Sequence, residues 1–308
     1  MQDHLSHLYG RAVVLFLLGT SWGLTLPVAH AETQSADALF RAGNDYFNER
    51  QLDKAVEVYE ACLELEPDYR EAWYNLGVVY GRQRRYKREI AAYRKAIELD
   101  PRYTRALYNL AMAYEDNGQV EDAVAAYQRV VEVAPRQVDP RINLGIAHAR
   151  AGDLVDAVAA YEGAIEIDPA LPDAWFNLGI AHARLADQEV EPAARQAHYR
   201  EEQRSYRQAV LYDSEYYKAW YNLAMAYNKT EEIDGEIKAY REALKIRPGY
   251  PQALYNLAKA LEDRRETAEA LRIWRRYLEV AQDLPTEQDF IAEARDEILR
   301  LMEAGTAP

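Results

Sequence analysis

The sequence predicts an all-α solenoid built from about seven copies of a helical hairpin. Three observations support this prediction. Prolines end similar phrases at Pro67, Pro101, Pro135 and Pro169, which are 34 residues apart. A segment of the type WYNLGVVY recurs once in almost every repeat, and its apolar residues follow the i, i+3, i+4, i+7 spacing of one helical face. Because a fixed period of this length is typical of a repeat array, it outweighs any local pattern.

Each unit is expected to hold two helices. In the second unit, Trp73, Leu76, Gly77 and Tyr80 form one apolar stripe on a first helix. A polar turn and a second amphipathic helix follow, and a proline closes the unit. The small residue at the position of Gly77 lets the two helix backbones cross closely. The units are expected to start at Ala36, Arg70, Thr104, Val138, Pro172, Tyr217 and Pro251.

These residues resemble the tetratricopeptide repeat family, whose pattern is W-x2-L-G-x2-Y, then A-x3-Y/F-x2-A, then a terminal proline. The resemblance covers about residues 36–284 and is best in the unit from Arg70 to Tyr103. It implies a right-handed superhelix of antiparallel helix pairs, whose first helices line a concave groove that binds protein segments. The usual alanine of the second helix is replaced by glutamate at Glu89, Glu202 and Glu236.

The fifth unit is longer than the others, because Trp175 and Trp220 are 45 residues apart. The insertion falls near residues 184–197, between the two helices of the unit. Pro192 suits a first helical turn, so the second helix is expected to run from Pro192 to Leu211 and to protrude.

A capping helix is expected over residues 285–302, after the last unit. Phe290, Ala294 and Ile298 would form the stripe that covers that unit, and Thr286 with Asp289 approximates a capping box. Terminal units need such a cover because one of their faces lacks a neighbour. Residues 303–308 are expected to be a disordered tail.

The N-terminus has the layout of a secretory signal. Arg11 precedes an apolar run over residues 12–26, and the small residues Ala29 and Ala31 follow it. Because the run is shorter than the roughly 20 residues that span a bilayer core, cleavage after Ala31 is favoured. Residues 32–35 would then be a short linker, and the protein would be periplasmic or secreted. The alternative is an uncleaved segment that tethers the chain to the inner membrane.

An asparagine recurs in the first helices at one register, although asparagine is only a middling helix former. Two explanations stay open. The carboxamides either pair with the backbone of an extended peptide, similar to the asparagine ladder of the glycosyltransferase that carries such an array, or bond the neighbouring helix. The predicted groove comprises Asn75, Asn109, Asn143, Asn177, Asn222 and Asn256, the aromatics Tyr74, Tyr108, Phe176, Tyr221 and Tyr255, the apolar residues Val78, Met112, Ile146, Ile180 and Met225, and Arg82, Arg150 and Arg184.

Other chemistry-bearing residues have ordinary structural explanations. His148 and His182 occupy equivalent positions in adjacent units, roughly 8–10 Å apart, which is too far for two ligands of one zinc ion. Cys62 falls where other units carry alanine, so a small buried thiol is expected. A basic cluster of Arg84, Arg85, Lys87 and Arg88 is either a solvated turn or a second docking surface for an acidic partner or anionic lipid.

The composition narrows the function. A formal net charge of -14 argues against binding nucleic acid through phosphates. No phosphate-binding loop, nucleophile elbow or His-Glu zinc motif is recognised, so neither an enzyme nor a cofactor, metal or small-molecule substrate is predicted. The leading hypothesis is a non-enzymatic scaffold that binds an extended protein segment during assembly of an envelope or secreted complex. The alternatives are a membrane-tethered, self-assembling coat, which would be a homo-oligomer, and an accessory that positions substrate for a separate enzyme.

Overall fold

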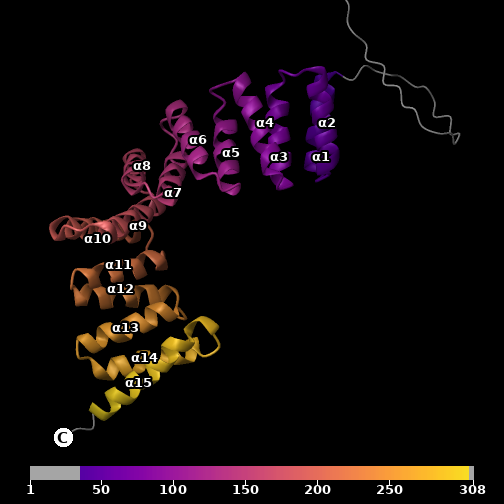
Figure 1. The fold of residues 1–308 in the computed structure, drawn as a ribbon. Coiled ribbons are helices and arrows are strands. Elements are labelled where there is room, and N and C mark those ends of the chain that lie inside the picture. The colour runs from indigo at the N-terminus through magenta and orange to yellow at the C-terminus, as the bar shows by residue number, and fades with distance from the viewer. Residues whose placement is uncertain (1–34, 305–308) are drawn as a thin grey trace, which may run out of the picture.

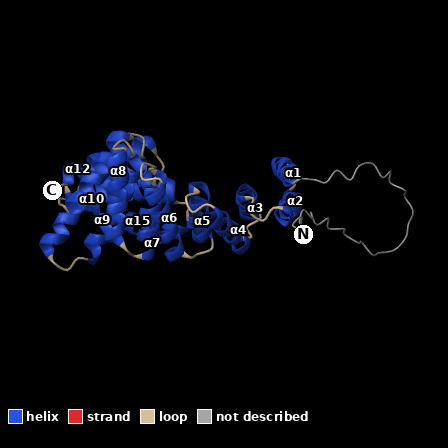
Figure 2. Ribbon diagram, turned by 90° about the horizontal axis from the view of Figure 1, so that it is seen from above, coloured by secondary structure: helices blue, strands red, loops and turns tan. Residues whose placement is uncertain are grey.

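The computed structural model describes residues 35–304, and these residues form α-helices and one short 3-10 helix (Figure 1). No strand occurs in this part of the chain, as Figure 2 also shows. The first helices of the seven units are α1 (Ala36–Asn48), α3 (Arg70–Arg82), α5 (Thr104–Asp116), α7 (Asp139–Ala151), α9 (Pro172–Gln188), α11 (Tyr217–Lys229) and α13 (Pro251–Asp263). The second helices are α2 (Leu52–Leu65), α4 (Tyr86–Leu99), α6 (Val120–Val133), α8 (Leu154–Ile167), α10 (Pro192–Tyr212), α12 (Ile233–Ile246) and α14 (Thr267–Ala281).

The predicted all-α solenoid is confirmed. Consecutive helices pack on each other in pairs, and each pair packs on the next. Helices α1 to α8 follow one another along one arm, the direction changes around α9 and α10, and α11 to α15 form a second arm (Figure 1). The signal sequence and its cleavage site lie outside the described residues, as do residues 305–308 of the expected tail. Among the helices described, none has both the length and the apolar character that a bilayer span requires.

The two helices of a unit meet where a small residue faces a tyrosine ring. A Cβ atom built on Gly77 would lie 2.6 Å from the Tyr93 ring, and one on Gly179 would lie 2.6 Å from the Tyr206 ring. Such distances are far below a van der Waals contact, so a side chain there would force the helices apart. The glycine therefore sets the close approach of the helices, as the sequence predicts.

The turn inside most units contains one residue in the left-handed region. Gly152 has φ 97°, and Arg84 has φ 56° at the equivalent place. Glycine adopts this conformation freely, whereas an arginine there costs about 1 kcal/mol. Between units, an indole closes the turn: Trp73 Nε1 donates to the Pro67 carbonyl and Trp175 Nε1 to the Pro169 carbonyl, both at 2.8 Å.

The fifth unit is the long hairpin of the array. Its second helix, α10, has 21 residues and begins at Pro192, so it extends beyond its neighbours (Figure 1). Trp175 of α9 packs against two core clusters, one among α7 to α9 and one among α10 to α15. The fifth unit therefore joins the cores of the two arms.

The C-terminal cap differs from the expected one in its phase. A 3-10 turn (Pro285–Glu287) precedes α15 (Gln288–Ala304), and Ile291, Ala294 and Leu301 are the buried stripe. Phe290 is 46% exposed and meets the Tyr255 ring edge-on, with centroids 5.4 Å apart. The expected stripe was therefore wrong by one residue at its start, because the turn rotates the helix.

The buried carboxylate of Glu287 anchors the turn before α15. It accepts hydrogen bonds from Tyr277 Oη at 2.9 Å and from Gln252 Nε2 at 3.2 Å. No hydrogen bond of the Thr286 side chain occurs in the described part of the chain, so the expected capping box is wrong, and Glu287 instead joins the turn to side chains of α13 and α14.

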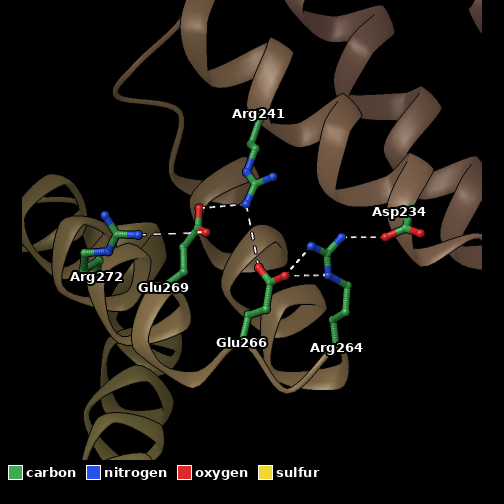
Figure 3. Close-up of polar contacts among 6 residues, drawn as sticks. All are labelled: Asp234, Arg241, Arg264, Glu266, Glu269 and Arg272. Atoms are coloured by element: carbon green, nitrogen blue, oxygen red, sulfur yellow. Dashed lines mark hydrogen bonds and ion pairs between the residues drawn. The ribbon is translucent and has the colours of Figure 1, made fainter.

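Ion pairs join the outer helices of the last two units (Figure 3). Arg241 of α12 contacts Glu269 of α14 at 2.9 Å, and Arg264 at the end of α13 contacts both Glu266 and Asp234. Since these side chains are exposed to solvent to differing degrees, the pairs stabilise the fold only weakly. They fix the alignment of α12 with α14 more than they stabilise the array.

Candidate binding surfaces

The first-helix face is the surface made by the asparagine row and its flanking residues. All six asparagines are partly buried, each on the first helix of its unit. Of the apolar neighbours, Met112 is 45% exposed and Met225 is 38% exposed, while Val78, Ile146 and Ile180 are intermediate. The face thus offers polar and apolar atoms side by side, which is what a binding surface for an extended chain needs.

Most of these asparagines bond the preceding unit. Asn143 Nδ2 donates to Tyr108 Oη at 2.7 Å, Asn109 Nδ2 to Tyr74 Oη at 3.2 Å, and Asn256 Nδ2 to Tyr221 Oη at 3.1 Å. In each case the acceptor is the tyrosine that precedes the asparagine of the unit before. In these units the second explanation, a bond to the neighbouring helix, holds for the amide donor.

Asn75 follows the same rule with a different acceptor. The first unit has Phe40 at the position of the tyrosine, and Asn75 Nδ2 donates instead to Asn44 Oδ1 at 2.7 Å. Asn44 itself accepts a 2.6 Å bond from Tyr59 Oη. The row therefore begins with a closed side-chain network.

Asn177 and Asn222 lack this partner. The preceding units carry Ile142 and Phe176 at the tyrosine position, and neither side chain has a hydroxyl. Within residues 35–304, the Asn177 carboxamide makes no side-chain hydrogen bond. Asn222 lies beside the phenol of Tyr206, whose pKa is raised by burial and held down slightly by this amide. At the centre of the row, the Asn177 carboxamide is therefore free to bind a ligand, whereas Asn222 keeps its contact with Tyr206.

The predicted aromatic and basic residues of the groove are largely engaged. The Phe176 ring lies 4.9 Å from Tyr216 and 5.7 Å from Tyr206, and Tyr74 lies similarly against Tyr93 and Tyr103. These rings form the floor of the first-helix face. Arg150 Nη1 pairs with Glu115 at 3.0 Å and Arg184 Nη1 donates to the Ala149 carbonyl at 2.7 Å, so both join adjacent units, while Arg82 is exposed.

The last unit is closed on this face by the cap. Lys259 of α13 pairs with Glu293 of α15 at 3.0 Å, and hydrogen bonds from Tyr255 and Lys259 lower the pKa of Glu293. Beside this pair lies a cleft of about 300 Å³ that includes Met225 and Asn256. The accessible part of the row therefore ends at this cleft.

The basic cluster lies at the turn between α3 and α4. Arg84, Arg85, Lys87 and Arg88 line an open recess of about 650 Å³ together with Asn117. Arg85 is 4.0 Å from Asp53 and the Arg88 guanidinium lies 5.7 Å from the Tyr80 ring centre. The four cations surround an accessible space, which is the geometry of an anion-binding surface.

Sequence reasoning missed the grooves between successive second helices. One, of about 740 Å³, is lined by Trp73, Leu76 and Tyr80, and the equivalent residues Trp220, Leu223 and Tyr227 line another of about 340 Å³. A third, of about 370 Å³, lies over Leu110 and Tyr114. The sequence analysis placed the apolar residues at the bottom of these grooves in the core. Helical periodicity shows which residues share a face, but it does not show how far apart the second helices lie.

The three glutamates at alanine positions are buried, each in a different environment. Glu89 lies against Gly81, and burial, with a contribution from Asp116, raises its pKa to about 7. Burial also raises the pKa of Glu202 and Glu236, but Lys229 pairs with Glu202 at 2.9 Å and Asn228 donates to Glu236 at 3.2 Å. Only the acid at Glu89 is left without a compensating donor among the described residues.

Two further titratable groups lie in the core. Cys62 is a buried free thiol whose Sγ contacts the Ala36 carbonyl at 3.2 Å, and burial raises its pKa to about 11. His182 faces His198 of α10, with the Nδ1 atoms 3.1 Å apart. Burial and the second imidazole lower the pKa of His182. The sequence did not predict this contact, because His198 lies in the lengthened part of the fifth unit, which has no equivalent position in the other units.

The fold and these surfaces define a class of protein: a helical-repeat solenoid whose exposed faces, rather than an enclosed pocket, are available to a ligand. The sequence pattern of the tetratricopeptide repeat matches residues 40–104, 108–172, 193–251 and 252–281. The chain belongs to the tetratricopeptide repeat family. Proteins of this family are generally protein-interaction scaffolds.

Solved structures share the fold at low sequence identity. The C-terminal part of a tetratricopeptide repeat protein from Cytophaga hutchinsonii has a TM-score of 0.66 and 16% identity over 81% of this chain and 98% of its own. YrrB, described as having an unusual peptide-binding site, has a TM-score of 0.53 and 19% identity over 65% and 97%. MamA has a TM-score of 0.51 and 22% identity over 56% and 95%. No curated protein is similar enough in sequence to count as a relative.

Proposed function

We propose that this chain is a non-enzymatic scaffold that binds an extended segment of a partner protein along its first-helix face. The observation that carries the proposal is the unpaired carboxamide of Asn177 in a row whose other members mostly bond the preceding unit. A carboxamide offers a donor and an acceptor, which match the C=O and N–H of a peptide backbone whatever its side chains are. The binding site is therefore centred on α9 and α11.

The flanking side chains give this centre its selectivity. Ile180 is half-buried and Met225 is 38% exposed, and they lie one helical turn from Asn177 and Asn222, respectively. An extended chain alternates its side chains, so apolar residues of the partner can rest on these two while its backbone meets Asn177 and Asn222. YrrB, which shares the fold, is described as having an unusual peptide-binding site, and this likeness supports a peptide ligand here.

The proposal includes an exported location and a role in assembling an envelope or secreted complex. It rests on the Arg11, apolar run and Ala29-x-Ala31 order in the sequence. Sequencing of the native N-terminus is expected to return Glu32. A native protein that begins at Met1 in a membrane fraction supports the tethered form instead.

The binding site is tested with two matched double variants. The partner is captured from an envelope extract with residues 32–308 as bait, identified by mass spectrometry, and its bound segment is titrated by calorimetry. Asn177→Ala with Asn222→Ala is expected to weaken binding about tenfold or more, because each net hydrogen bond contributes about 0.5–1.5 kcal/mol. The melting temperature is expected to fall slightly, because Asn222 also contacts the buried phenol of Tyr206.

The control variant is Asn109→Ala with Asn143→Ala, whose side chains bond Tyr74 and Tyr108. It is expected to lower the unfolding free energy by about 1–3 kcal/mol, since two inter-unit hydrogen bonds are lost. Affinity per folded molecule is expected to fall less than for the central pair. Equal affinity of wild type and the central variant would contradict the proposed site, and large assemblies in sedimentation would favour the coat.

A further inference from the structure

The turn between α7 and α8 brings together an imidazole and two carboxylates. His148 lies in the last turn of α7, Asp153 directly precedes α8, and Asp156 lies in the first turn of α8. Gly152, with φ 97°, reverses the chain between them. One ligand atom from each of the three residues lies within 4.8 Å of the other two. The hairpin turn therefore converges three metal-binding groups on one point.

The imidazole has a buried nitrogen with no partner. The His148 side chain is 8% exposed, and its Nδ1 atom makes no hydrogen bond. Buried polar atoms are nearly always paired, so an unpaired one needs an explanation. Nδ1 faces Asp153, and its distance of 3.7 Å from Asp153 Oδ2 is too long for a hydrogen bond.

The same distance suits a shared metal ion. A first-row metal lies roughly 2.0–2.2 Å from imidazole nitrogen and from carboxylate oxygen, so donors about 3.7 Å apart enclose a bent N–metal–O angle. Asp153 and Asp156 are both exposed and can rotate to complete the set. Neither carboxylate pairs with a lysine or arginine in the described part of the chain, so a cation meets no competitor there.

The neighbouring unit shows what this turn is like without the imidazole. Tyr114 occupies the position of His148 and its hydroxyl accepts a 2.8 Å bond from Arg94. Asp122 occupies the position of Asp156 and accepts a 2.6 Å bond from Gln119. Both groups thus have a hydrogen-bond partner there, whereas His148 Nδ1 has none, so the fourth unit departs from its neighbour.

We propose that His148, Asp153 and Asp156 bind one divalent transition-metal ion, of the Zn²⁺ class, which fastens the turn of the fourth unit. Imidazole favours Zn²⁺, Cu²⁺ or Ni²⁺, whereas Ca²⁺ and Mg²⁺ prefer sites made of oxygen alone. Three protein ligands leave a fourth position for water or for a donor of a bound partner. The site differs from the His148 and His182 pair of adjacent units, which cannot share an ion, because all three ligands come from one hairpin.

The test uses tag-free residues 32–308 stripped of metal with a chelator. Calorimetric titration with Zn²⁺ is expected to give one ion per chain, and Co²⁺ is expected to give the visible absorption of a four- or five-coordinate site. Asp156→Asn is expected to weaken Zn²⁺ binding at least tenfold, since even second-shell changes cost about 10–100-fold. Asp122→Asn, the same change one unit earlier, is the matched control and is expected to leave affinity unchanged.

A second variant separates ligation from folding. His148→Tyr installs the residue that Tyr80, Tyr114 and Tyr227 supply at this position in other units, so the hairpin is expected to fold and to lose the ion. Circular dichroism and melting check the fold. Zn²⁺ binding that is absent in the wild type, or that is equal in wild type, His148→Tyr and Asp156→Asn, would overturn the site. Binding of Ca²⁺ in preference to Zn²⁺ would overturn the assigned class.

Discussion

The fourth and fifth units carry the same asparagine at the same register, yet its side chain has different surroundings. Asn143 donates to Tyr108 of the unit before, whereas Asn177 meets Ile142 at that place and stays unpaired. The residue in question is identical, and the difference lies one unit earlier. In a stacked array each unit contacts only its neighbours, so the neighbour decides whether a repeated residue is structural or available for binding.

The three buried glutamates also show that neighbouring residues decide the behaviour of a repeated position. Glu202 of α10 and Glu236 of α12 have donors from the second arm, Lys229 and Asn228, while Glu89 in the first arm has the bare backbone of Gly81 beside it. A carboxylate buried without a donor is expensive, so Glu89 binds a proton near neutral pH. The first arm therefore holds a pH-sensitive glutamate, whereas donors from the second arm stabilise the charged form of the equivalent glutamates.

The largest expected effect comes from breaking the joint between the arms. Tyr206→Ala removes a ring that is 2% exposed and packs on Gly179 and Phe176, so it is expected to cost about 3–5 kcal/mol of unfolding free energy. Because the fifth unit links two core clusters, the melting curve is expected to split into two transitions. Hydrogen exchange should show the loss of protection around α9 and α10.

The control for this change is Tyr59→Ala in the first unit. Tyr59 is 1% exposed and packs on Gly43 in the same way. The cost is expected to be similar, but only the end of the array should fray, with α5 to α15 protected as before. A single, coincident transition in both variants would mean that the array unfolds as one cooperative body.

The next effect concerns Glu89. Its folded-state pKa of about 7 is above the value of an unfolded glutamate, so the native state binds more protons between pH 4.5 and pH 7. The contribution of Glu89 to stability is thus fully present below about pH 4.5 and is lost as the pH rises through about 7. Glu89→Gln is expected to raise the unfolding free energy at pH 8 by about 1–3 kcal/mol and to flatten this part of the pH profile.

Glu202→Gln sharpens the contrast. It leaves the ammonium of Lys229 without its 2.9 Å partner, so it is expected to destabilise the fold at pH 8. Melting curves of both variants at pH 5 and pH 8 provide the measurement. If both variants are stabilised alike at pH 8, the partners of the second arm contribute nothing and the contrast fails.

The fold could be predicted from the sequence because it depends on residues that repeat. Proline spacing and the stripe around Gly77 fix the hairpin and the 34-residue period. The candidate site could be predicted only in part. The register of Asn177 is visible within its own unit. Whether its amide is paired depends on Ile142, the residue that precedes the asparagine of the unit before. Only a comparison of each asparagine with that residue would have predicted the unpaired amide.

Other features needed the geometry itself. His148, Asp153 and Asp156 are separated by five and three residues, a spacing that has no fixed meaning until the turn at Gly152 is known. The approach of His198 to His182 depends on the length of α10 and on the insertion before it. The phase of the cap depends on a 3-10 turn that moves the buried stripe to Ile291, and helical periodicity alone does not locate such a turn.

The smallest effect provides the sharpest test of the comparison between the fourth and fifth units. Ile142→Tyr places a hydroxyl where Tyr108 and Tyr74 have theirs, so Asn177 is expected to donate to it as Asn143 does to Tyr108 at 2.7 Å. The new bond should raise the unfolding free energy by about 0.5–1.5 kcal/mol, provided that the ring fits as the other tyrosines do. Ile142→Phe supplies the same ring without the hydroxyl, so the difference between the two variants isolates the hydrogen bond. The same bond occupies the amide that the proposed ligand needs, and the tyrosine variant should therefore bind the partner segment more weakly than the phenylalanine variant. Equal stability and equal affinity of the two variants would show that the missing hydroxyl is not what distinguishes the centre of the row.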